Sequence, residues 1–101
     1  MQWIRNILQK LNESQDIRDA KEKICNEYYY VLRVLQNEHN EKIHLQSIFK
    51  LLLNYEEKWY NYIYDSSKFS IYETIELEKY LCERCKILRN YYKCLKYIEL
   101  K

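Results

Sequence analysis

Neither glycine nor proline occurs anywhere in the 101 residues of this chain. Glycine supplies positive φ angles and proline supplies rigid turns, and a chain built only of helices needs neither. The absence therefore favours an all-α fold. Coding bias is a second contribution, because Asn, Lys, Ile and Tyr are abundant while alanine, the best helix former, occurs only at Ala20. The same bias weakens any argument from the tyrosine count.

The last third of the chain predicts one long helix. Ser70 and Glu73 have the spacing of a capping box, in which each side chain accepts from the backbone amide of the other residue. The following run is long enough for a helix of about 45 Å at 1.5 Å per residue. One face of this helix is apolar, with Leu77, Tyr80, Leu81, Leu88, Tyr91, Leu95 and Ile98. The opposite face carries a row that we call the basic stripe: Lys79, Lys86, Arg89, Lys93 and Lys96.

Apolar periodicity predicts three further helices, over residues 3–11, 17–38 and 41–64, with polar breaks at 12–16, 37–40 and 65–68. The inward set of the second is Ile17, Ala20, Ile24, Tyr28, Val31, Leu32 and Leu35. The inward set of the third is Leu45, Ile48, Phe49, Leu52, Trp59, Tyr62 and Ile63. Short connections make successive helices antiparallel neighbours. We therefore predict an antiparallel up-down bundle of four helices, with a short first and a long last helix, as one domain over residues 1–101.

The net charge of +2 is too small to indicate a nucleic-acid partner, but the charge is unevenly distributed. Residues 84–101 contain six basic residues and one acid, whereas residues 13–27 contain five acids and three bases. Within the basic end, Arg84 interrupts the apolar face and is expected to need an ion-pair partner or to meet another subunit. Part of the bias suits the helix dipole, since acids favour helix starts and bases favour helix ends.

The sequence contains no apolar run long enough for a signal peptide or a membrane span, and its four cysteines lack the spacing of a secreted disulfide scaffold. We therefore expect an intracellular, cytoplasmic protein without a cofactor. Cys82 and Cys85 fall within the long helix, where sulfurs three residues apart suit a disulfide poorly. A metal site would need ligands from elsewhere, such as Cys25, His39, His44 or Glu78. We expect these cysteines to be small side chains at the edge of the core. A redox role is the alternative, because Lys79 and Lys86 flank Cys82 and favour its thiolate.

Residues 33–39 resemble the Arg-x4-6-His pattern of HEPN ribonucleases, which are helical bundles of similar size. The resemblance rests on Arg33 and His39, and it implies metal-independent cleavage of RNA by these two residues. Family members often carry a polar residue directly after the arginine, where this chain has Val34. Without the pattern, Arg33 is a solvated charge, and His39 suits the end of a helix.

The basic stripe and the twelve tyrosines carry the main functional hypothesis. Aromatic residues surround the helix around Trp59, so some must face outward, and exposed aromatics with basic residues are typical of protein interfaces. We expect a non-catalytic adaptor or inhibitor, such as a viral accessory protein that antagonises host defence, bound to a protein with an acidic surface. Its expected binding residues are Lys79, Lys86, Arg89, Lys93, Lys96, Tyr97, Tyr60 and Tyr64. The alternative is that the stripe binds nucleic acid. The sequence also allows a homodimer. The simplest interpretation is that the stripe is the solvated outer face of the helix.

Overall fold

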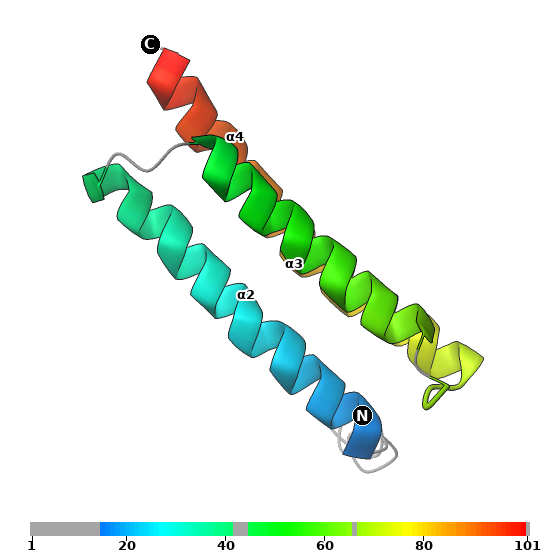
Figure 1. Cartoon of the computed structure of the whole chain (residues 1–101). Coiled ribbons are helices and arrows are strands. Elements are labelled where there is room, and N and C mark those ends of the chain that lie inside the picture. Colours follow the sequence, from blue (N-terminus) through cyan, green and yellow to red (C-terminus); the bar gives the residue numbers. More distant parts are fainter. Residues whose placement is uncertain (1–14, 42–44, 66, 101) are drawn as a thin grey trace, which may run out of the picture.

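The computed structural model describes residues 15–41, 45–65 and 67–100, with the backbone alone given for the helix ends 38–41 and 98–100. Within these ranges the chain forms three helices: α2 (Gln15–Glu41), α3 (Leu45–Asp65) and α4 (Ile71–Leu100) (Figure 1). The all-α class is confirmed. The predicted four-helix count is not, because the helix expected at residues 3–11 lies outside the described residues.

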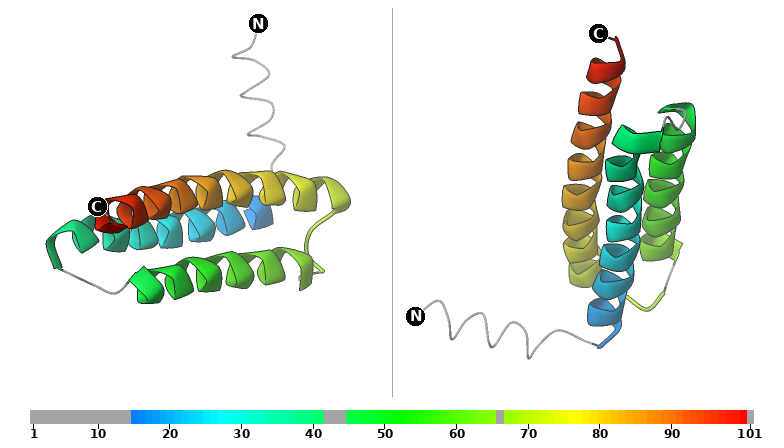
Figure 2. Two further views of the ribbon diagram at one scale, coloured as in Figure 1. Left: turned by 90° about the horizontal axis from the view of Figure 1, so that it is seen from above. Right: turned by 90° about the vertical axis from the view of Figure 1, so that its left-hand side faces the viewer.

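The three helices lie along a common direction as an elongated bundle (Figure 2). Successive helices are antiparallel, so α2 and α4 run the same way, and α4 packs against both other helices. The long α4 is thus the element that the other two share. Its two flanks, one turned to α2 and one to α3, provide most of the contacts that hold the bundle together.

The predicted capping box starts α4. The Ser70 amide donates to Glu73 Oε1 at 3.0 Å, and the Glu73 amide donates to Ser70 Oγ at 3.2 Å. The Thr74 hydroxyl adds a bond to the Ser70 carbonyl at 2.9 Å. These bonds satisfy amide groups that have no partner within the helix, so the start of α4 is fixed by local sequence.

The core follows the three-and-four spacing of apolar residues on each helix. Buried side chains of α2 are Ile17, Ala20, Ile24, Tyr28, Val31 and Leu35. Buried side chains of α3 are Ile48, Leu52, Tyr55, Trp59 and Ile63, and those of α4 are Leu77, Leu81, Cys85, Leu88 and Leu95. Two polar atoms within the core find partners, since Tyr55 donates to the Ile24 carbonyl at 2.9 Å and the Trp59 indole donates to Glu27. Most of the predicted inward residues are therefore confirmed.

Several predicted details are wrong. The expected break at residues 37–40 is absent, because α2 continues to Glu41, and α3 begins at Leu45 rather than at residue 41. Phe49 was assigned to the core but is 45% exposed. Tyr55 is buried although it was not assigned to the core. The predicted inward position of Ile98 lies outside the described side chains.

Candidate partner-binding site

The basic stripe follows the exposed side of α4. Lys79, Lys86, Lys93 and Lys96 are all exposed, as is Tyr97. At 100° per residue, Arg89 and Lys96 lie on the flank of α4 that is turned to α3, whereas Lys79 and Lys86 point further out. The stripe is therefore not one uniform surface. Its second half lies beside another helix, and its first half does not.

Arg89 is bound within the bundle. Its Nε donates to Glu56 Oε1 of α3 and its Nη2 donates to Glu56 Oε2, both at 2.5 Å. This paired, charge-assisted contact raises the pKa of Arg89 above its ordinary value, chiefly through the hydrogen bond to Glu56. The Arg89 donors used here fix the position of α4 against α3. Arg89 therefore marks a boundary along the stripe and is less available to a partner than the lysines.

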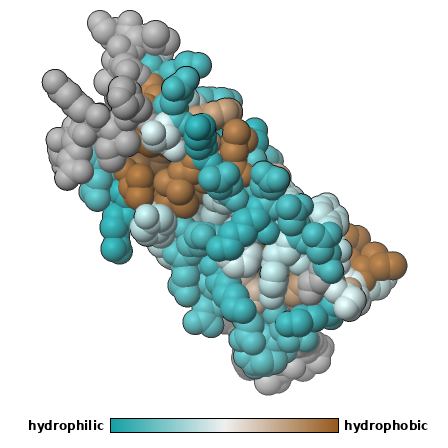
Figure 3. Space-filling model, viewed as in Figure 1, coloured by the Kyte–Doolittle hydropathy of each residue, from teal (hydrophilic) through white to brown (hydrophobic). Residues whose placement is uncertain are grey.

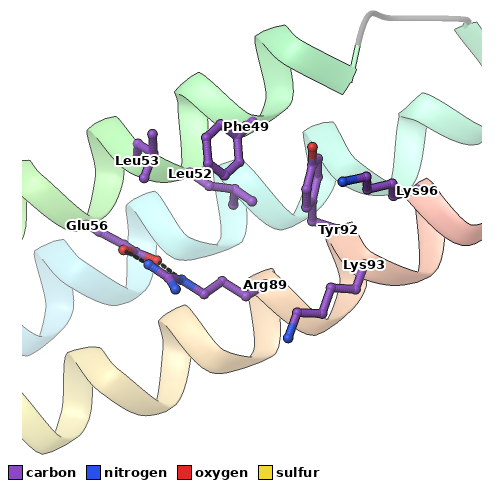
Figure 4. A pocket seen from close by; sticks show the side chains of 8 residues that line it. All are labelled: Phe49, Leu52, Leu53, Glu56, Arg89, Tyr92, Lys93 and Lys96. Atoms are coloured by element: carbon purple, nitrogen blue, oxygen red, sulfur yellow. Dashed lines mark hydrogen bonds and ion pairs between the residues drawn. The ribbon is translucent and has the colours of Figure 1, made fainter.

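Beyond this ion pair, α3 and α4 enclose a shallow groove of about 250 Å³ (Figure 4). Phe49 and Tyr92 face each other across it, with ring centroids 5.7 Å apart. Leu52 lies between the helices, and Leu53 is 41% exposed one turn after Phe49. The remaining lining residues are Glu56, Arg89, Lys93 and Lys96. The groove thus combines an apolar floor with basic residues along its α4 side.

The electrostatics of this groove are set by two lysines. Among the lining residues that the structure describes, Glu56 is the one carboxylate, and Arg89 neutralises its charge. Among the side chains that the structure describes, Lys93 and Lys96 have no carboxylate within ion-pair distance. The groove therefore carries a net positive charge beside exposed apolar surface.

The two predicted tyrosines lie on the same side of α3 as the groove. Phe49, Leu53, Glu56, Tyr60 and Tyr64 follow one another at intervals of three or four residues, which places them in one row of the helix. The rings of Tyr60 and Tyr64 stack, with centroids 6.4 Å apart and an interplanar angle of 16°. Burial raises the pKa of the Tyr60 phenol, and Tyr64 is exposed. The row therefore joins the tyrosines to the groove through Glu56.

Sequence reasoning missed the groove itself. Phe49 was assigned to the core, while Leu53, Glu56 and Tyr92 were given no role. The signal was present in the row of α3 residues that begins at Phe49, because it lies beside the buried row and carries apolar and aromatic side chains. The residues of α4 that lie opposite this row depend on how the two helices pack, and the sequence pattern of α3 alone does not determine that packing.

On the opposite flank of α4, basic side chains contact the bundle itself. The Arg84 guanidinium lies 3.5 Å from the centroid of the Tyr80 ring and donates to the Tyr80 carbonyl at 3.2 Å. Its ion pair, at 3.4 Å, is with the adjacent Glu83. Lys21 of α2 pairs with Glu76 at 2.8 Å and lies over the same Tyr80 ring. The expected partner of Arg84 is thus its own helix.

The cysteines differ in burial. Cys85 is buried, which raises its thiol pKa to about 12. Cys82 and Cys25 are half-buried, Cys94 is exposed, and all four are free thiols. Among the residues that the structure describes, there is no group of three or more His, Cys, Asp or Glu side chains that could hold a metal ion. The position of Cys85 agrees with a small core side chain. Cys94, rather than Cys82, is the thiol most open to solvent.

Of the two residues that carry the resemblance to HEPN ribonucleases, the structure describes the side chain of one. Arg33 is exposed on α2, and the side chain of His39 lies outside the described residues.

Within the described ranges, no helix has both the length and the apolar character needed to cross a membrane. Comparison with protein families, with characterised proteins and with solved structures finds no match for this chain.

Proposed function

We propose that this chain is a non-catalytic protein-binding module of the cytoplasm, an adaptor or an inhibitor, which contacts its partner through the α3–α4 edge. One observation carries the proposal: Lys93 and Lys96 border a groove whose apolar residues Phe49 and Leu53 are exposed. Exposed apolar residues rimmed by polar ones are typical of protein interaction sites. Four free thiols agree with a reducing compartment.

The composition of the edge also supports a protein partner. Interface centres are enriched in aromatic residues and arginine, and their rims are polar. Here Phe49, Tyr92, Tyr60 and Tyr64 supply the aromatics. The bidentate ion pair between Arg89 and Glu56 holds both side chains in place in the middle of this edge. Side chains that are already ordered lose less conformational entropy when a partner binds.

Nucleic-acid binding remains the second candidate because Lys79, Lys86 and Lys93 are exposed at seven-residue intervals along α4. Cations in such a row follow a phosphate backbone, and the resulting affinity falls steeply with salt. The apolar groove has no role in that mode of binding. The two candidates therefore predict different responses to mutation of the groove.

The test is chemical crosslinking of the tagged full chain in host lysate, with and without nuclease, followed by mass spectrometry. Lys93→Glu/Lys96→Glu reverses the charge at the groove, and Lys79→Glu/Lys86→Glu makes the same change outside it. We expect a nuclease-resistant protein that is captured by the wild type and by the second variant but not by the first. Capture that is lost equally in both variants, or lost with nuclease, would indicate that the stripe binds the phosphates of a nucleic acid. Identical capture by all three forms would reject the groove.

A further inference from the structure

We infer that the groove between α3 and α4 binds an amphipathic helix of a partner protein, whose apolar face is flanked by carboxylates. This inference rests on the proposed function and specifies the chemistry of the partner. Its evidence is the shape of the groove, the charge of Lys93 and Lys96, and the pairing of Glu56 with Arg89.

The shape favours a helix as occupant. Phe49 and Leu53 are one turn apart on α3, and Tyr92 and Lys96 are one turn apart on α4. The two antiparallel helices therefore present two ridges with an apolar depression between them, which is the surface that a third helix packs against. A helix docked in this way inserts side chains at positions i, i+3, i+4 and i+7. The groove volume of about 250 Å³ lies below the range of about 300–1,000 Å³ that is typical of small-molecule sites.

The charge selects which helix. Lys93 and Lys96 both line the groove from the α4 side, so we expect the α4-facing flank of a docked helix to meet their positive charge. Glu56 would repel an acidic ligand, but Arg89 occupies both of its carboxylate oxygens. Carboxylates on that flank would therefore meet two lysines and, among the described lining residues, no uncompensated acid. Complementary charge of this kind sets the orientation of a docked helix and excludes basic competitors.

Two other occupants fit less well. A two-fold interface pairs a surface with itself, so a symmetric dimer through this groove would bring Lys93 and Lys96 of both copies into one interface, where Arg89 already pairs with Glu56 of the groove. A phosphate backbone would use the lysines but would leave Phe49 and Leu53 without an apolar partner. If either of these occupied the groove, the peptide selection described next would enrich no helical peptide.

The probe is a displayed library of helical peptides of about 16 residues, enough for four turns. Leucines are fixed at i, i+4 and i+7, and the flanking positions are randomised among Glu, Lys, Gln and Ser. The full chain is the bait in three forms: wild type, Lys93→Glu/Lys96→Glu, and Lys79→Glu/Lys86→Glu. We expect the wild type and the last form to enrich glutamate on one flank, and the groove variant to enrich lysine there.

A selected acidic peptide is then measured in solution. We expect at least a tenfold loss of affinity in Lys93→Glu/Lys96→Glu and less than a twofold loss in Lys79→Glu/Lys86→Glu. Leu53→Ser removes apolar surface without a charge change, and it should also weaken binding at least tenfold. Circular dichroism of each variant checks that the bundle is folded, and NMR shifts should change around Phe49 and Tyr92.

Several results would overturn the inference. No enrichment, enrichment without charge preference, or the same peptides from all three baits would do so. Peptides that bind at Tyr60 and Tyr64 would reject the groove as the site but leave a protein-binding function standing. Conversely, acidic helices that bind the groove, together with a lysate that yields no protein partner, would reject the proposed function and retain the chemistry of the groove.

Discussion

Basic side chains lie along both flanks of α4, but they make different contacts there. On the flank turned to α2, Arg84 stacks on Tyr80, and Lys21 pairs with Glu76, so the cations stabilise the bundle. On the flank turned to α3, Lys93 and Lys96 lie beside an apolar groove without a carboxylate partner among the described side chains. The number of cations on a helix thus does not identify a binding surface. What distinguishes these cations is whether a carboxylate lies within ion-pair distance: Arg84 has Glu83 and Lys21 has Glu76, whereas Glu56 of the groove is already paired with Arg89.

Apolar surface is exposed at two places on the face of the bundle seen in Figure 3: over the end where α3 begins and at the tip where α4 begins. The tip includes Ile71 and Ile75, which are exposed. Phe49 and Leu53, which are exposed on the first half of α3, line the groove that Lys93 and Lys96 also line. The proposed site is the α3–α4 groove because there the apolar residues line a depression together with two lysines.

The largest expected effect separates two adjacent leucines of α3. Leu52 is 3% exposed, and Leu52→Ala should lower the free energy of unfolding by about 2–5 kcal/mol through lost burial and a cavity. Leu53 is 41% exposed, and Leu53→Ala should cost under about 1 kcal/mol. Urea unfolding measures both. Equal losses would mean that Leu53 belongs to the core and that the groove is not an open surface.

A smaller effect should come from the ion pair that lies between the groove and Tyr60. Arg89→Met leaves the Glu56 side chain, which is 15% exposed, without either donor. Because Arg89 itself is 57% exposed, we expect a loss of about 1 kcal/mol, near the low end for an unsatisfied acceptor. Lys93→Met is the matched control on the same helix and should change stability by less than about 0.5 kcal/mol. A control that costs as much as Arg89→Met would show that Lys93 also stabilises the bundle.

Much of the fold could be predicted because it depends on neighbours in sequence. The capping box of Ser70 and Glu73 is local, and the inward row of α2 follows from helix period alone. The predicted break at 37–40 failed because polar residues can face solvent on a continuing helix, and neither glycine nor proline stops it there. Phe49 was misplaced because it follows the buried Ile48, at the edge of the inward face, where periodicity does not decide between burial and exposure.

The site could be predicted only in part. The periodicity of α4 identified the lysines, but it could not show that Arg89 is paired with Glu56, 33 residues earlier in the chain. Nor could it show that Lys93 and Lys96 lie beside Phe49 and Leu53. These relations depend on how α3 and α4 pack, and one amphipathic pattern per helix leaves the rotation and register of its neighbour open.

The buried thiol of Cys85 should give a pH-dependent change in stability about as large as the effect of Arg89→Met. The pKa of Cys85 is raised from 9.0 to about 12, chiefly by burial, so the folded chain keeps the neutral thiol where the unfolded chain ionises. The stabilisation is complete below pH 9 and is lost as pH rises from 9 towards 12. Between pH 8 and pH 10 this linkage should remove about 1 kcal/mol. Cys85→Ala should lose that much less stability over this range than Cys94→Ala, in which the exposed thiol is removed. If both variants show the same dependence of stability on pH, the Cys85 thiol is accessible to water.

The smallest expected effect tests the α2 flank. Arg84 is 24% exposed at its side chain and contacts the Tyr80 ring, so Arg84→Met should lower the free energy of unfolding by about 0.5–1 kcal/mol. Lys86→Met, two residues later and exposed, should leave stability unchanged within about 0.5 kcal/mol. Thermal unfolding with both variants at one salt concentration measures the difference, and Arg84→Met should leave partner binding intact because Arg84 faces away from the groove. If Arg84→Met instead weakens binding at full stability, the two flanks of α4 do not divide into a structural and a binding side.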